Sequence, residues 1–182
     1  GEKLFCEYDQ QVKHYPEKRG IVHNEILLPP NAPQEYADRN TLWNAAEAVE
    51  KQWNSQLARR WVLTIPREIP PDQYAVLIRE FCQKQFVSKG MIADFAIHAP
   101  HPPGHNPHAH VLLTMRAMDE HGKWLSKSRK VYDLDENGER IKLPSGRWKS
   151  HKEDTVDWND QKYCEIWRHE WEVIQNRYLE AN

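Results

Sequence analysis

The feature that most constrains the fold is a proline-rich stretch between two short apolar runs. Residues 99–107 hold several prolines and Gly104, and proline lacks the N–H that a helix or an inner strand needs. We therefore expect a loop there. The flanking residues 91–98 and 108–115 are rich in apolar side chains, which predicts two strands, and their short connection makes them antiparallel.

Three histidines lie at the loop end of these two strands. His98 closes the first strand, and His108 and His110 open the second. Because side chains alternate between the two faces of a strand, His108 and His110 point the same way, and antiparallel pairing brings His98 close to them. Three imidazoles that share one centre can hold a divalent ion and leave coordination positions open, as in a catalytic metal site.

The type of donor narrows the choice of ion. Three nitrogen ligands favour Mn²⁺, Co²⁺, Ni²⁺ or Zn²⁺, whereas Mg²⁺ prefers oxygen. The alternative is that these histidines are ordinary satisfied polar groups on a strand. His101 and His105 lie within the loop itself, and we expect them to be solvated.

The hydrophobic pattern of the remaining chain predicts an α+β fold. Apolar residues recur at spacings of three and four in three segments, which indicates amphipathic helices over 39–60, 72–88 and 157–179. Strands are predicted at 21–28 and 61–66, where apolar runs end in proline. Five tryptophans sit at helical spacings and are assigned to the core: Trp43, Trp53, Trp158, Trp167 and Trp171.

Residues 117–155 contain three turn signals with short apolar pieces between them, which predicts an insertion rich in hairpins. Residues 123–130 and 140–152 are basic and contain no acid. Tryptophans interleave with the cations, as expected where bases stack and phosphates pair; the alternative is a solvated charged face. The candidate nucleic-acid contacts are Lys123, Trp124, Lys127, Arg129, Lys130, Arg147 and Lys149, and Trp148 lies between the last two.

Composition limits the class of protein. The chain has 182 residues, enough for one domain with a core, and its net charge of −2 does not by itself indicate a nucleic-acid binder. No apolar run approaches the length of a membrane span, and no secretion signal is visible. Three widely spaced cysteines form no CxxC pair, which favours a reducing cytoplasm over a disulfide framework.

Several motifs resemble the MobA/MobL relaxases, the nicking enzymes of mobilisable and conjugative plasmids. The resemblance rests on Gly20–Pro29, which reads GIVHNEILLP, on Ile65-Pro66-Arg67-Glu68, and on Phe86–Asp94. It continues through Ile97-His98 to Asn106-Pro107-His108-Ala109-His110, and into the tryptophan-rich end from Trp158 to Trp171. It covers most of the chain, and residues 117–155 carry it least.

The resemblance implies a fold, a reaction and partners. The family fold is an antiparallel sheet of about five strands flanked by helices, with the histidine triad on the sheet. The implied reaction is attack by a tyrosine on one phosphodiester of single-stranded DNA at a plasmid transfer origin, with Mn²⁺ or Mg²⁺ at the triad. Such a bacterial, cytoplasmic endonuclease, also classed as a hydrolase, would act beside accessory mobilisation proteins and a transfer coupling protein, without membrane insertion.

Two positions depart from the family pattern. Gly1–Leu4 resembles the stretch just after the nucleophilic tyrosine, so we expect the nucleophile and the first strand before Gly1, and a chain without them to be inactive. Tyr8 and Tyr15 are the nearest substitutes. The acid that relatives carry two residues after the first ligand is replaced by Pro100, which leaves Glu25 as the candidate for orienting a ligand imidazole.

Two other functions are compatible with the histidines. A rolling-circle replication initiator also uses paired histidines, and its tyrosine follows them on a helix, which would require Tyr163 or Tyr178. A non-catalytic metal- or DNA-binding module would hold zinc tightly in a closed site.

Overall fold

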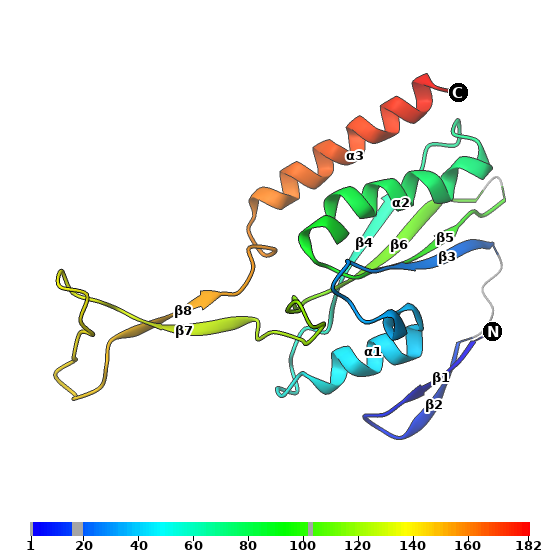
Figure 1. Cartoon of the computed structure of the whole chain (residues 1–182). Coiled ribbons are helices and arrows are strands. Elements are labelled where there is room, and N and C mark those ends of the chain that lie inside the picture. Colours follow the sequence, from blue (N-terminus) through cyan, green and yellow to red (C-terminus); the bar gives the residue numbers. More distant parts are fainter. Residues whose placement is uncertain (1, 16–19, 102–103) are drawn as a thin grey trace.

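The computed structural model describes residues 2–15, 20–101 and 104–182, and its centre is a four-stranded antiparallel sheet (Figure 1). The strand order is β3-β5-β6-β4. All four strands fall within a few residues of the segments predicted from the sequence: β3 (Ile21–Leu27), β4 (Ala58–Thr64), β5 (Ala93–His98) and β6 (His108–Thr114). The α+β class and the antiparallel β5–β6 hairpin are confirmed.

Helices cover both faces of this sheet. α2 (Tyr74–Gln85) and α3 (Lys162–Glu180) lie on one face, and α1 (Arg39–Ala48) lies on the other (Figure 1). The larger core is on the α2 side, where the fully buried side chains of Phe95 and Val111 point. Each such side chain contributes about 1.5–3 kcal/mol through removal of apolar surface from water. None of the described helices is long and apolar enough to cross a membrane.

Short 3₁₀ turns adjoin the helices. η1 (Gln34–Ala37) precedes α1, and η2 (Pro71–Gln73) leads into α2. η3 (Val87–Lys89) follows α2 and ends at Gly90, whose φ of 98° is left-handed. Together η2, α2 and η3 fill the segment 72–88 that the sequence predicts as one helix.

The predicted helix over 39–60 is wrong beyond its first half. α1 ends at Ala48, because the chain must turn and reach the start of β4 at Ala58. The apolar residues continue at helical spacing past Ala48, but the chain there is not helical. Trp53 is consequently 94% exposed, so its assignment to the core is wrong, whereas Trp158 and Trp167 are buried as expected.

Residues 2–15 form a hairpin that the sequence pattern did not predict. β1 (Glu2–Cys6) and β2 (Gln11–Tyr15) make a separate two-stranded sheet. Asn44 of α1 holds it: the Asn44 side chain donates to the Phe5 carbonyl at 2.8 Å, and its oxygen accepts from the Glu7 N–H at 2.9 Å. The main sheet of the described residues therefore has four strands where the resemblance implied about five.

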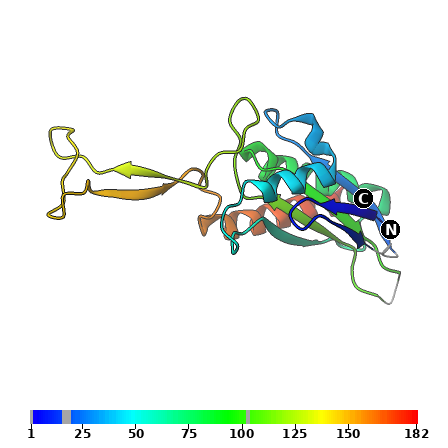
Figure 2. The ribbon, with the colours of Figure 1, turned by 90° about the horizontal axis from the view of Figure 1, so that it is seen from below.

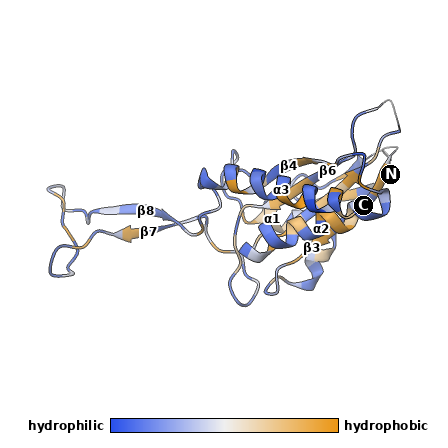
Figure 3. Ribbon diagram, turned by 90° about the horizontal axis from the view of Figure 1, so that it is seen from above, coloured by the Kyte–Doolittle hydropathy of each residue, from blue (hydrophilic) through white to orange (hydrophobic). Residues whose placement is uncertain are grey.

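Residues 126–155 leave the body as a long arm (Figures 1 and 2). Its stem pairs β7 (Ser128–Tyr132) with β8 (Ser150–Asp154). Two further bridges, Leu134↔Arg140 and Lys142↔Trp148, form the tip. Much of the arm is hydrophilic, in contrast to the apolar interior of the body (Figure 3).

Candidate metal centre

The structure brings the three predicted ligands side by side on one face of the sheet. His98 lies directly opposite His108 in the β5–β6 pair, and His110 lies opposite Ala96, so all three side chains share the face that α1 partly covers. The ring centroids of His98 and His108 are 5.1 Å apart, and those of His108 and His110 are 4.9 Å apart. Each histidine is half-buried, which leaves the cluster accessible from solvent.

The tautomer of His108 follows from one hydrogen bond. Its Nδ1 lies 2.8 Å from the backbone carbonyl of Asn106. A carbonyl oxygen can only accept, so a neutral His108 ring carries its proton on Nδ1 and presents the Nε2 lone pair to a ligand. In metal-binding imidazoles, a hydrogen bond from the nitrogen that does not bind the metal commonly fixes the orientation of the ring.

The rings are adjacent without forming an assembled coordination shell. Neighbouring rings stand edge to face, at 86° and 85°. In the described part of the chain, no group of three His, Cys, Asp or Glu side chains is arranged as a metal site. The donor chemistry and the fixed His108 tautomer fit a divalent ion, and the rings would have to turn for their nitrogens to converge on it.

Gly20, in the turn just before β3, supports the cluster. Its carbonyl accepts from the Ala99 N–H at 2.8 Å, and its φ is 88°. A Cβ at this position would lie 2.9 Å from Nε2 of His98 and 3.0 Å from its Cδ2. Residue 20 therefore has to be glycine both for its backbone conformation and for the space that the His98 ring occupies.

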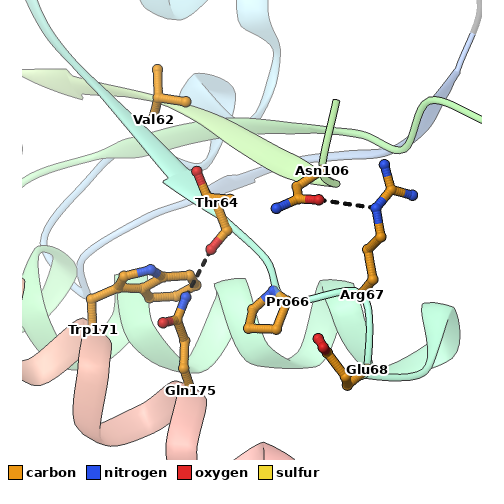
Figure 4. A pocket seen from close by; sticks show the side chains of 8 residues that line it. All are labelled: Val62, Thr64, Pro66, Arg67, Glu68, Asn106, Trp171 and Gln175. Carbon is orange, nitrogen blue, oxygen red and sulfur yellow. Dashed lines mark hydrogen bonds between the residues drawn. The ribbon is translucent and has the colours of Figure 1, made fainter. Parts of the chain in front are cut away.

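The histidine face is closed at one end of the sheet, and a hollow lies at the β4 edge, between that edge and α3. At the closed end, Asp94 accepts from Arg39 at 2.7 and 2.8 Å and from the Trp43 indole at 2.9 Å, which ties α1 to β5. At the β4 edge, Val62 and Thr64 lie opposite His110 and His108. These two residues line a hollow of about 540 Å³ (Figure 4), together with Pro66, Arg67, Glu68, Asn106, Trp171 and Gln175.

The structure does not place Glu25 where it could orient a ligand of the cluster. Glu25 pairs with Phe95, so its side chain lies on the opposite face of the sheet from His98. There it accepts from Arg79 at 2.8–3.1 Å and lies 3.0 Å from Nε2 of His23. The Arg79 bonds, and secondarily His23, lower the pKa of Glu25. The carboxylate therefore orients His23 instead.

The two tyrosines required by the rolling-circle alternative also lie on that opposite side. Tyr163 is buried against Trp167 and donates to Asp157 at 2.9 Å. Tyr178 donates to Glu80 at 3.0 Å. The bond to Asp157 and burial raise the pKa of Tyr163, and burial followed by the Glu80 bond raises that of Tyr178. α3 packs against the sheet face opposite the histidines, so this geometry does not favour the alternative.

Three of the predicted nucleic-acid contacts lie in the body or at the root of the arm. Trp124 stacks on Tyr36 with centroids 5.4 Å apart and donates to its hydroxyl at 3.0 Å, so its ring packs in the body, and its role in base stacking stays a prediction. Lys127 bonds Glu50 at 3.0 Å and the Gln56 carbonyl at 2.8 Å. Lys123 is exposed, in a turn capped by Asp119.

The remaining four predicted contacts lie on the arm and are exposed. Arg129 pairs with Glu153 at 3.1 Å, and Lys149 lies 3.5 Å from Asp133. Lys130 lies over the Tyr132 ring, 4.9 Å from its centroid. Arg147 is exposed near the tip, next to the 45%-exposed Trp148. The arm thus combines cations and aromatic side chains, with acids that offset part of its positive charge.

An antiparallel sheet with helices on both faces and a histidine cluster on its two inner strands defines a relaxase-like α+β domain. The comparisons with known proteins agree. A model of the MobA/MobL family matches residues 1–182, and the chain belongs to that family.

Similar proteins point the same way. The chain is 35% identical over 155 residues to the conjugal transfer protein TraA of Agrobacterium fabrum, which covers 80% of this chain and 14% of that protein. It is 34% identical over 145 residues to a probable mobilization protein MobA of Bifidobacterium longum, covering 79% of this chain and 26% of that protein. The chain thus spans a small part of these relatives.

A solved structure shares the fold. It is described as "Molecular Basis of Vancomycin Resistance Transfer in Staphylococcus aureus" and superposes with a TM-score of 0.79 at 32% identity. The match covers 99% of this chain and 80% of the other.

Proposed function

We propose that this chain is the catalytic domain of a DNA relaxase, which nicks single-stranded DNA at a plasmid transfer origin in the bacterial cytoplasm. The observation that carries the proposal is the cluster of His98, His108 and His110 on the accessible part of the sheet, in a chain of the MobA/MobL family. The conjugal-transfer and mobilisation names of the relatives support the same process.

In this proposal the three histidines hold a divalent ion, Mn²⁺ or Mg²⁺ in use, with Ni²⁺, Co²⁺ or Zn²⁺ also able to bind. The bound ion would withdraw electron density from a non-bridging oxygen of the scissile phosphate and stabilise the more negative transition state. The chain itself supplies neutral imidazoles, which leave the full charge of the ion on the site. The hollow at the β4 edge offers space for the flanking nucleotide.

The reaction needs a tyrosine hydroxyl as the nucleophile. Its oxygen would form a bond to phosphorus while the bond to the 3′-oxygen breaks, giving a 5′-phosphotyrosine link and a 3′-hydroxyl that takes up the proton. In this proposal the tyrosine is expected upstream of Gly1, as the family resemblance implies. Tyr8 and Tyr15 are 80% and 54% exposed on the β1–β2 hairpin, which does not pair with the sheet that bears the histidines.

The proposal predicts metal-dependent recognition of one single-stranded sequence. Fluorescence anisotropy with a panel of origin oligonucleotides should show one that binds tightly with Mn²⁺ and weakly with EDTA. His108→Ala and His110→Ala should remove the Mn²⁺ dependence, while His169→Ala, on the far side in α3, should not. Tight zinc retention with no DNA affinity would contradict the proposal and favour the non-catalytic module.

Cleavage is a separate expectation. Residues 1–182 should bind the oligonucleotide without cutting it, whereas a protein extended upstream to include the family's tyrosine should cut it and remain attached to the 5′ end of the product. Denaturing gels of a labelled oligonucleotide measure both. Cleavage by the shorter chain that is lost on Tyr163→Phe would instead establish the rolling-circle mechanism.

A further inference from the structure

We propose that Arg67 is a positioning residue for His108, because it holds the loop residues around the Asn106 carbonyl, the group that fixes the tautomer of the His108 ring. Arg67 lies just beyond the end of β4 and reaches over the loop that precedes β6. Its Nη2 donates to the carbonyls of Gly104 and His105 at 2.6 and 2.8 Å. Its Nε donates to Oδ1 of Asn106 at 2.9 Å (Figure 4).

A second attachment secures the same segment. The N–H of Ile65 donates to the Pro107 carbonyl at 2.7 Å, which continues the β4–β6 pairing past Thr64↔His108. Residues 104–107 are therefore tied to the end of β4 by one side chain and by one backbone bond. Between these two attachments lies the Asn106 carbonyl, the group that accepts from Nδ1 of His108 at 2.8 Å.

The position of that carbonyl decides what His108 can do. A neutral imidazole carries its proton on either nitrogen, and the hydrogen bond made by one nitrogen selects which of them is left for a ligand. A displaced Asn106 carbonyl would let the ring rotate or take the other tautomer. The ring would then have to reorganise before binding an ion, which lowers affinity.

The chemistry of the side chain suits this role. A guanidinium is a planar, permanently charged fork that can reach three acceptors at once, whereas a lysine ammonium is a compact point charge on a flexible stem. A lysine at position 67 could bond to one of these oxygens but could not hold three of them in one geometry. Arg67→Lys should therefore retain only part of the Nδ1–H preference of His108 that is lost in Arg67→Gln.

The inference rests on the proposed metal centre, so its first test is made without metal. Long-range ¹H–¹⁵N spectra of the metal-free protein, labelled on histidine nitrogen, report which nitrogen of His108 is protonated. The wild-type ring should be in the Nδ1–H form. Arg67→Gln should give a mixture of the Nδ1–H and Nε2–H tautomers, and Arg67→Lys should give an intermediate population. The control Arg168→Gln, on α3, should match wild type.

Mn²⁺ titration calorimetry gives the second readout. Arg67→Gln should weaken binding about tenfold, at the lower end of the range for outer partners of a metal ligand. Asn106→Ala, which keeps the backbone carbonyl, should cost less than Arg67→Gln. This second variant keeps the test decisive if Arg67→Gln does not fold: Asn106→Ala should then broaden or partly shift the His108 tautomer signal, and an unchanged signal would overturn the proposal.

Two outcomes separate this inference from the proposed function. If the His108 tautomer and Mn²⁺ affinity are unchanged in Arg67→Gln while oligonucleotide affinity falls, Arg67 binds a phosphate directly and the inference is wrong. If the wild-type protein shows the Nδ1–H tautomer, lost in Arg67→Gln, but binds no Mn²⁺, the positioning role stands and the metal centre fails.

Discussion

Gly20 shows how a single position can determine whether the histidine cluster forms. Gly20→Ala would add both backbone strain, because φ is 88°, and a methyl group 2.9 Å from Nε2 of His98. We expect Mn²⁺ affinity to fall at least tenfold, measured by calorimetry, with a loss of stability of about 1 kcal/mol or more.

Gly138 provides a matched control for that variant. Its φ is 81°, but a Cβ there would have nothing within 4 Å. Gly138→Ala should therefore show the strain without the clash and leave Mn²⁺ affinity unchanged. Equal effects of the two substitutions on Mn²⁺ binding would contradict the role assigned to Gly20.

Glu50 makes a pH-dependent contribution at the root of the arm. Burial alone would raise its pKa, but bonds from Arg116, Lys127 and Ser55 lower the pKa from 4.5 to about 2. Its contribution is therefore complete above pH 4.5 and is lost as the pH falls toward 2; it is on the order of 3 kcal/mol. In urea unfolding, the difference between wild type and Glu50→Gln should shrink across that window. A difference that is constant with pH would contradict this account.

At the scale of elements, the strands were the most predictable part of the fold and the cluster followed from them. The period of two and the irregular stretch 99–107 fix which residues share a face, so the proximity of His98, His108 and His110 could be inferred without coordinates. The placement of Glu25 could not, because it depends on the register of β3 against β5, which is irregular between Ile21 and His23.

The incorrect predictions also have their cause in tertiary structure, which a local sequence pattern does not contain. Helical spacing persists to Leu57, but the helix ends at Ala48 because the chain must return to the sheet. A local pattern cannot report that tertiary requirement. The packing of Trp124 on Tyr36 joins residues 88 positions apart, which composition alone does not reveal. The hydrogen bonds from Arg67 to residues 104–106 likewise join two segments that are distant in sequence.

The arm is the element on which nucleic-acid binding can be tested apart from the cluster. Arg147→Glu with Lys149→Glu should weaken oligonucleotide binding and flatten its dependence on salt, by about 0.7 in the logarithmic slope for each phosphate that the protein no longer neutralises. Reversal of two cations on the α2–α3 face, Lys84→Glu with Arg168→Glu, is the control. Anisotropy titrations at several salt concentrations would refute the role of the arm if the two double variants behaved alike.

At the scale of the whole molecule, a layered body carries an arm that adds little to its core. Of residues 123–157, all of which the structure describes, none is buried. Ser128 and Asp154 are paired across the base of the arm, so a short glycine-serine link can replace the residues between them. The free energy of unfolding in urea should change by less than about 1 kcal/mol, while oligonucleotide affinity falls. A loss of several kcal/mol would show that the arm is part of the folding unit.

If the proposed function holds, the separation of these parts would let one small domain both recognise and process DNA. The histidines are supported by rigid elements: β5, β6, the Gly20 backbone and the loop held by Arg67. The arm reaches away from them and is fixed at its root by Glu50 with Arg116 and Lys127. The residues of the arm can therefore vary without disturbing the geometry of the histidine cluster.

An anomalous difference map from crystals grown with Mn²⁺ tests the proposed metal centre most directly. One strong peak is expected within bonding distance of a nitrogen from each of His98, His108 and His110, with Nε2 as the donor of His108. A map with no peak between these rings, or with Mn²⁺ bound elsewhere while they keep their edge-to-face arrangement, would contradict it.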